Sequence, residues 1–151
     1  MAETTVSGAI HPILENDYAS IWMGIEVLAV SDGHATIRMT LRQEMLNGFG
    51  MAHGGMIFAF ADTAFALACN PASPADPDSI TVAAGVDINF LKPAYQGQVI
   101  TAVADRRSSA GRSGLYDIQI FAADPGAAAS SGQPGELIAE FRGRSRTIPK
   151  K

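Results

Sequence analysis

The sequence is poor in cysteine, which limits its covalent structure. Only one of its 151 residues is cysteine, so no disulfide can form within the chain and a reducing compartment is compatible with it. Residues 1–17 lack a basic stretch followed by an apolar run, which argues against a secretory signal peptide. The most apolar window, Gly55–Cys69, contains Asp62 and is shorter than the roughly 20 residues of a membrane span. We therefore expect a soluble cytoplasmic protein.

Charge is scarce too. Charged residues make up 17% of the chain, against about 25% in an average soluble protein. The net charge is −4, which argues against a basic nucleic-acid footprint or a polybasic membrane anchor. A lone monomer with so few charges would be under-charged, so we expect part of the surface either to contact other subunits or to line a ligand groove.

Several motifs of common enzymes are missing. No nucleophile elbow occurs, since the nearest string, Gly111–Leu115, has the wrong glycine spacing. Neither a Walker A loop nor a G-x-G-x-x-G fingerprint is present. His11, His34 and His53 are too far apart for a zinc motif, so we expect neither metal nor cofactor. Cys69 ends an apolar run, which favours a buried, inert thiol.

The order of predicted elements indicates one α+β domain over residues 1–151. We expect a short helix over 11–23, a hairpin turning at Ser31–Gly33, and a long helix over 55–70 that ends at Asn70-Pro71. Four more strands follow, with Val82, Ala84, Val86, Ile88 and Phe90 on one face of the first. The other strands are predicted at Val99–Arg106, Leu115–Ala123 and Glu136–Arg142, with a low-complexity hairpin tip at Asp124–Gly135. Strands grouped around one helix predict an antiparallel sheet.

The long helix is apolar on almost every side, so every side must be covered. One sheet covers only one side, and a chain of this length has no second layer. A partner subunit is the simplest cover.

Two features of this helix are typical of a catalytic site. His53-Gly54-Gly55 lies at its start, where unpaired N–H groups and the helix dipole can polarise a carbonyl, although two glycines can equally serve only a tight turn. Asp62 lies among apolar residues in the middle. A structural hydrogen bond is one explanation for it, but we favour a functional base whose pKa is raised by burial.

The spacing of these features predicts a shared site. Gly55 and Asp62 are seven residues apart, so they lie on one helical face, about 10 Å apart along the axis. One reacting carbonyl needs both groups within about 3 Å or one water molecule. If two helices pack antiparallel across a twofold axis, Gly55 of one chain meets Asp62 of the other.

These residues resemble the hotdog-fold acyl-CoA thioesterases, and within them the phenylacetyl-CoA thioesterase group of phenylacetic acid degradation. The resemblance runs from about Asn16 to Ile148. It is carried by Leu46-Asn47-Gly48, His53-Gly54-Gly55, Phe60–Ala66 and Ala68-Cys69-Asn70, and more weakly by Asp87–Pro93, Tyr116–Ile118 and Phe141–Gly143.

The resemblance implies an antiparallel sheet around the central helix, a homodimer or homotetramer, and acyl-CoA hydrolysis without a metal or cofactor. It implies Asp62 as base or nucleophile. It also implies that the N–H of Gly55, with Gly54 and His53, polarises the thioester carbonyl, that Asn47 positions water or the carbonyl, and that Thr63 makes a secondary contact.

The phosphates of CoA call for basic partners, and the candidates are Lys92, Arg106 and Arg112. Each can equally be a solvated surface charge. A non-catalytic acyl-CoA binding protein on the same fold stays open as an alternative function. A hotdog hydratase or dehydratase is disfavoured because the expected His/Asp pair is missing.

Overall fold

The computed structural model describes residues 7–127 and 134–151. Its α-helices include α1 (Tyr18–Met23) and α2 (Gly54–Cys69), residues 125–127 are also helical, and short 3-10 helices cover Pro12–Leu14 and Gln43–Met45. The strands are β1 (Ser7–Gly8), β2 (Glu26–Ser31), β3 (His34–Thr40), β4 (Ser79–Phe90), β5 (Val99–Ala110), β6 (Ser113–Ala123) and β7 (Glu136–Pro149). No helix in these described ranges is long and apolar enough to cross a membrane.

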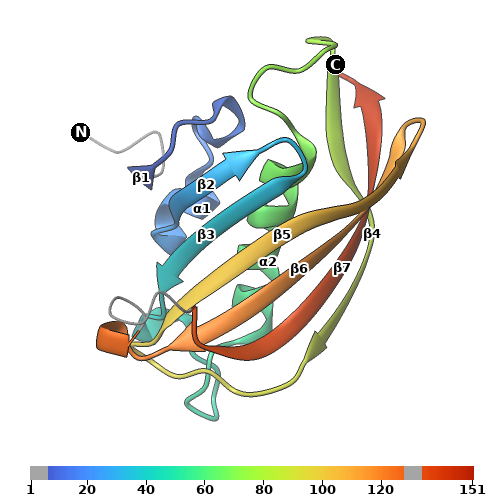
Figure 1. Ribbon diagram of the computed structural model, residues 1–151. Helices are drawn as coiled ribbons and strands as arrows, with labels where there is room; N and C mark the ends of the chain where they lie inside the picture. The colour runs from blue at the N-terminus through green and yellow to red at the C-terminus, as the bar shows by residue number, and fades with distance from the viewer. Residues whose placement is uncertain (1–6, 128–133) are drawn as a thin grey trace.

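All seven strands form one sheet in the order β1-β2-β3-β5-β6-β7-β4. Only the β1–β2 pair is parallel, so the predicted α+β class with an antiparallel sheet is confirmed. The sheet curves around α2, which lies along its concave face (Figure 1). Two strands run further than predicted, since β5 reaches Ala110 and β7 reaches Pro149; their polar ends pair with β6 and β4 beyond the core.

Helix α2 forms as the sequence indicates, within one residue of the predicted range at each end. His53 caps its start, and Asn70 ends it in an extended conformation. The Asn70 side chain exchanges hydrogen bonds with the backbone of Thr81, at 2.8 and 2.9 Å, and so joins the end of α2 to β4. The side of α2 that faces the sheet is buried in the core. The buried residues on this side are Ile57, Phe60, Ala61, Ala64, Phe65, Leu67 and Ala68.

The single helix predicted over 11–23 is wrong, because the chain breaks in the middle of it. Pro12–Leu14 form a 3-10 turn, Asn16 adopts a left-handed φ of 62°, and α1 starts only after Asp17. Asp17 caps α1 by accepting the N–H of Ser20 at 3.1 Å. The apolar residues in this segment therefore belong to two separate elements, the 3-10 turn and α1, which pack on the same core.

The prediction of one apolar face along 82–90 is also wrong. Strand β4 carries a bulge at Ala84, between the pairs Ala83–Ser145 and Gly85–Arg144. Directly opposed residues share a face, so Val86, opposite Gly143, faces α2, whereas Val82, opposite Arg146, faces the other way. Because of the extra residue, the side chains before the bulge point to the opposite faces of the sheet from those that the alternating pattern predicts.

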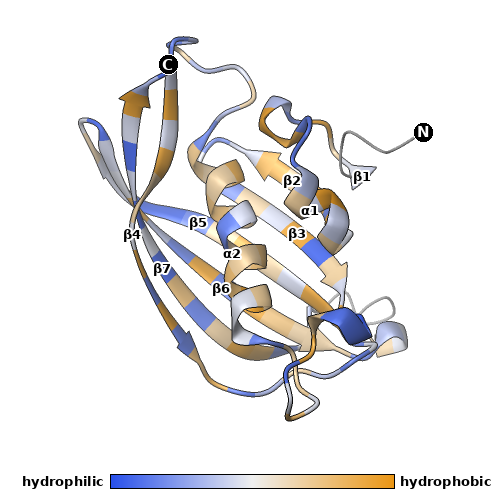
Figure 2. Cartoon of the chain, turned by 180° about the vertical axis from the view of Figure 1, so that it is seen from behind, coloured by the Kyte–Doolittle hydropathy of each residue, from blue (hydrophilic) through white to orange (hydrophobic). Residues whose placement is uncertain are grey.

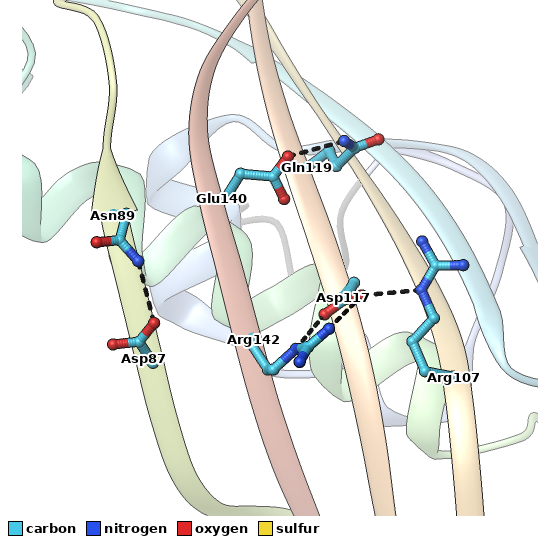
Figure 3. A network of polar contacts seen from close by, with 7 residues as sticks. All are labelled: Asp87, Asn89, Arg107, Asp117, Gln119, Glu140 and Arg142. Carbon is cyan, nitrogen blue, oxygen red and sulfur yellow. Dashed lines mark hydrogen bonds and ion pairs between the residues drawn. The ribbon is translucent and has the colours of Figure 1, made fainter.

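The outer face of the sheet is polar and is joined by side-chain contacts. Asp117 on β6 accepts hydrogen bonds from Arg142 at 2.7 Å and from Arg107 at 2.9 Å, and Gln119 bonds Glu140 (Figure 3). Arg142 and Arg107 hold the pKa of Asp117 below its ordinary value. Figure 3 shows this network on the side of the sheet away from α2, so the candidate site lies on the other side.

The face of α2 away from the sheet is open, as the sequence predicts. Figure 2 shows α2 in front of the sheet with only α1 beside it among the described elements. The exposed or half-exposed positions on α2 include Gly55, Phe58, Ala59, Asp62 and Ala66. They recur every three or four residues and form one stripe, which we call the open stripe. Gly55 and Asp62 thus share a face.

One close contact between sheet and helix gives a stability prediction. A Cβ atom on Gly143 would lie 2.5 Å from the ring of Phe65. That ring is buried and packs against Tyr116 and Phe141, so it has no room to move away. Gly143→Ala is expected to lose about 1–3 kcal/mol of unfolding free energy, which urea denaturation measures.

The matched control is Gly85→Ala on the neighbouring strand. There a Cβ meets only the end of the flexible Arg144 side chain, at 3.4 Å. This variant is expected to stay within about 0.5 kcal/mol of the wild type. Equal stability of the two variants would contradict the close packing of Phe65 on β7.

Candidate active site

The N-terminus of α2 presents two different N–H groups. The Gly55 N–H donates to Nδ1 of His53 at 2.9 Å, and the His53 carbonyl accepts from Met56 and Ile57. The Gly54 N–H has no hydrogen bond within the described part of the chain. Gly54 is therefore ready to donate to a ligand, whereas Gly55 must first release the imidazole.

A cavity of about 340 Å³ opens at this end of α2. It brings together three of the predicted site residues, Asn47, Gly54 and Lys92. The remaining lining is largely apolar and comes from Met51, Ala52, Ile57, Phe90, Leu91, Pro93 and Ala94. A small, mostly apolar hollow with a few polar groups is typical of a small-molecule site.

Phe90 packs against the start of α2 at position 54. A Cβ on Gly54 would lie 3.3 Å from Cζ of Phe90, so the ring packs on the bare backbone of the helix start. Phe90 itself is 52% exposed. The last residue of β4 thus forms a wall of the cavity, a role that the strand pattern alone did not indicate.

Asn47 holds its own loop together. Its side-chain Oδ1 accepts the N–H groups of Phe49 at 2.9 Å and Met51 at 3.2 Å. The side-chain carbonyl is therefore engaged, and only the amide NH₂ is left to contact a ligand. The predicted role in positioning water or a carbonyl rests on that group.

Asp62 lies half-buried in the middle of the open stripe. Burial raises the pKa of its carboxyl group, and the negative charge of Asp17 raises that pKa further. Within the residues that the structure describes, no hydrogen bond to its carboxylate is present, which removes the structural explanation considered from the sequence. A desolvated carboxylate without a partner is poised to accept a proton.

Thr63 points to α1. Its hydroxyl lies 2.9 Å from Oγ of Ser20 and 3.5 Å from the carbonyl of Ala59. The contact fixes α1 against α2 next to Asp62. In this structure the Thr63 hydroxyl is therefore engaged within the protein, and its predicted contact with substrate requires that hydroxyl to change partners.

The three predicted phosphate ligands do not meet in one chain. Lys92 lines the cavity and is ion-paired with Glu136. Arg106 makes a two-pronged ion pair with Asp32, at 3.1 and 3.2 Å, and lies at the far end of α2, where Gly33 donates to the Ala68 carbonyl. Arg112 lines a separate hollow of about 530 Å³ beside Asn70 and Thr147.

Cys69 is buried, as predicted. Burial raises the pKa of its thiol to about 12, so the reactive thiolate is essentially absent near neutral pH. Among the described residues, no group of three or more His, Cys, Asp or Glu side chains is arranged to hold a metal ion. The absence of a metal from the reaction stays a prediction.

Two residues that touch this region were not predicted from the sequence. Asp17 and Ser20 connect α1 to Thr63, and Asp17 acts electrostatically on Asp62. A helix-start pattern at Asp17 was available in the sequence, but the apolar spacing of residues 13–22 obscured it.

In one chain, the two halves of the candidate site stay apart. Asp62 is not among the residues that line the cavity at Gly54, and eight residues of helix separate the two, about 12 Å along the axis. A single carbonyl cannot contact both groups of the same chain.

The chain is similar to known thioesterases in sequence and in fold. A model of the thioesterase superfamily matches residues 49–129. Acyl-coenzyme A thioesterase PaaI of Escherichia coli strain K12 is 37% identical over 138 residues, which cover 91% of this chain and 88% of that protein. The solved structure of the E. coli PaaI protein, from the phenylacetic acid degradation operon, has a TM-score of 0.76 at 35% identity and covers 90% of this chain and 88% of its own.

A second solved structure is similar over nearly its whole length. It is a point mutant of the phenylacetic acid degradation protein PaaI from Thermus thermophilus, with a TM-score of 0.72 at 28% identity. The alignment covers 86% of this chain and 98% of that one. This chain therefore belongs to the thioesterase superfamily, has its hotdog fold, and is a hydrolase that acts on thioester bonds.

Proposed function

We propose that this protein hydrolyses an acyl-CoA thioester, of the phenylacetyl type or a related aryl-acetyl type, to the free acid and CoA. The observation that carries the proposal is Asp62, a half-buried carboxylate without a hydrogen-bond partner among the described residues, on the same helix as the free N–H of Gly54. The E. coli relative is named an acyl-coenzyme A thioesterase, which supports the substrate class. The apolar cavity with Phe90 in its wall suits an aromatic acyl group.

In the proposed reaction, the N–H groups at the start of α2 bind the thioester oxygen and Asp62 acts on the attacking water. The Gly54 N–H, joined by that of Gly55 when His53 moves aside, stabilises the negative charge that develops on the thioester oxygen. Water attacks the carbonyl carbon while Asp62 accepts its proton. As the carbon–sulfur bond breaks, that proton passes to the departing CoA thiolate, which leaves the free acid behind.

A nucleophilic role for Asp62 uses the same geometry. Its carboxylate attacks the carbonyl carbon, and CoA leaves as the thiolate when the carbon–sulfur bond breaks. Water then hydrolyses the resulting mixed anhydride to the free acid and the Asp62 carboxylate, and the proton that the water gives up is taken by the CoA thiolate. Single turnover in water labelled with oxygen-18 distinguishes the two routes. Label in Asp62 indicates the nucleophile, because water has then attacked the Asp62 carbonyl of a mixed anhydride.

A second copy of the chain completes the site in this proposal. Strand β4 pairs with β7 on one side only and is the edge of the sheet. Val82, Val86 and Phe90 on it are each at least 36% exposed, and Phe58 on the open stripe is 38% exposed. A long apolar edge strand needs a cover. Antiparallel packing of two chains covers this edge and the open stripe together, and brings the helix start of one chain to Asp62 of the other.

The number of chains follows as a further proposal. A homodimer is the smallest assembly with complete sites, and a homotetramer pairs two such dimers. The subunit contacts account for the shortage of charge in the sequence. We place the protein in the cytoplasm, where its single cysteine stays reduced.

A panel of acyl-CoA esters tests the function. Purified protein is mixed with phenylacetyl-, benzoyl-, hexanoyl- and acetyl-CoA, and thiol release is followed with a thiol reagent; buried Cys69 contributes little background. We expect phenylacetyl-CoA to have the highest kcat/KM. Tight binding of the esters by calorimetry with no thiol release would instead favour the non-catalytic binding protein.

A further inference from the structure

A chain of polar groups runs from α1 to α2 beside Asp62. The Asp17 carboxylate accepts the Ser20 N–H at 3.1 Å through one oxygen and the Ser20 hydroxyl at 2.8 Å through the other. Oγ of Ser20 lies 2.9 Å from Oγ1 of Thr63, the residue that follows Asp62. Ser20 is 1% exposed, so the middle of this polar chain is shielded from solvent, whereas Asp17 and Thr63 at its ends are half-buried.

Counting protons fixes the direction of these bonds. A serine hydroxyl has one proton, and Ser20 gives it to Asp17. Ser20 must therefore accept the proton of the Thr63 hydroxyl. Both oxygens of Asp17 act as acceptors in these hydrogen bonds. The polar chain thus ends at the negatively charged Asp17 carboxylate.

This charge acts on Asp62. It raises the pKa of the Asp62 carboxyl, as the second cause after burial. Cys69, on the same helix, also interacts with Asp62, but its pKa of about 12 keeps it neutral. The described strands that pack on α2 face it with mainly apolar side chains and Tyr116, and His11 bonds the Asn70 carbonyl at the far end. Asp17 is the one charged side chain of the described residues that shifts the pKa of Asp62.

We propose that Asp17 is a positioning residue for thioester hydrolysis: tied through Ser20 to Thr63, the neighbour of Asp62, its carboxylate strengthens Asp62 as a base. This inference rests on the proposed role of Asp62. A second carboxylate near the base raises the affinity of that base for a proton, as in other pairs of acids whose environments separate their roles.

Asp17→Asn tests the proposal without disturbing the fold. Asparagine caps a helix about as well as aspartate, so α1 is kept while the charge is removed. Activity rises with pH as Asp62 ionises, and removing a nearby negative charge makes ionisation easier. We expect the acid limb of the kcat/KM profile to shift to lower pH, with a plateau that falls by about tenfold or less, since the base itself is still present.

Two variants separate charge from structure. Glu15→Gln removes the same charge from an exposed residue two positions away, for which no side-chain partner is found in the described chain. Ser20→Ala cuts the hydroxyl link but leaves Asp17 charged. Both are expected to keep the wild-type acid limb. An equal shift in Glu15→Gln, or an unmoved limb in Asp17→Asn, overturns the proposal.

Asp62→Asn distinguishes this inference from the proposed function. If Asp62→Asn is inactive and the acid limb of the kcat/KM profile of Asp17→Asn lies at the wild-type pH, only the role of Asp17 fails. If Asp62→Asn is fully active, the role of Asp62 fails and the role of Asp17 fails with it. An inactive Asp62→Asn together with a shifted limb in Asp17→Asn supports both.

Discussion

Asp62→Asn is expected to lower kcat by about 10²–10⁴-fold, the usual contribution of a general base, with little change in KM. The amide has nearly the same shape as the carboxylate but neither accepts a proton from water nor attacks a thioester. The residues that line the cavity at Gly54 are unchanged, and the amide keeps the size of the carboxylate, so substrate binding is retained. Steady-state kinetics on the best acyl-CoA ester measures both constants.

Stability provides the control for this variant. Because the pKa of Asp62 is raised in the folded state, the stabilising protonated form dominates at low pH and is lost as pH rises through that raised pKa. At pH 7 the wild type is therefore destabilised by an amount that Asn removes. We expect the variant to be at least as stable at pH 7, and the difference to vanish below the ordinary pKa of 3.8.

Urea unfolding at the two pH values measures this difference. A variant that is inactive but equally or more stable has lost chemistry and not its fold. Full activity in a correctly folded Asp62→Asn contradicts both the base and the nucleophile mechanism.

Two inactive variants are expected to restore activity to each other when their chains are mixed. The partner of Asp62→Asn is Gly54→Pro, which deletes the free N–H at the cavity. Proline is favoured at the first position of a helix, and His53 already has the extended conformation, with ψ of 132°, that a following proline requires. The loss of one such donor is expected to lower kcat by about 10²–10³-fold.

The number of intact sites in the mixed dimers determines how much activity is restored. In a mixed dimer, one site combines Gly54 of the Asp62→Asn chain with Asp62 of the other chain and is intact, while the second site carries both changes. Equal amounts mixed at random are expected to give about a quarter of the wild-type activity. Co-refolding, followed by thiol release, measures it.

If each site is formed within one chain, the result is different. Every site then carries one of the two substitutions, so the mixture stays inactive. Light scattering on the wild type provides the control for assembly. A monomer at assay concentration would contradict the shared site, whatever the mixing experiment gives.

Local features of the sequence predicted the elements that depend on a strong apolar pattern. Helix α2 was placed within one residue at each end because it is apolar on nearly all sides and ends at Asn70-Pro71. Its open stripe, with Gly55 and Asp62 on one face, follows from helical spacing alone. The antiparallel sheet followed from the order of the strands.

Features that depend on distant contacts were not predictable in this way. The bulge at Ala84 is defined by the partner strand β7, and no local signal reversed the faces of Val82 and Val86. No local pattern indicates that Arg106 pairs with Asp32, or that the Gly55 N–H donates to His53. Asp17 and Asp62 are far apart in the sequence, so their interaction depends on how α1 packs.

The bulge at Ala84 also affects how far assembly can proceed. An uninterrupted edge strand is a template along which chain after chain can add, and such growth ends in fibres. In β4 the extra residue twists the edge and turns Ile80 and Val82 away from the face on which Val86 lies. A second copy can pair with the apolar half that adjoins the cavity, but the edge does not continue as one flat surface. In the proposed assembly, the apolar half of β4 is covered by one partner copy, and the interrupted edge opposes the addition of further chains.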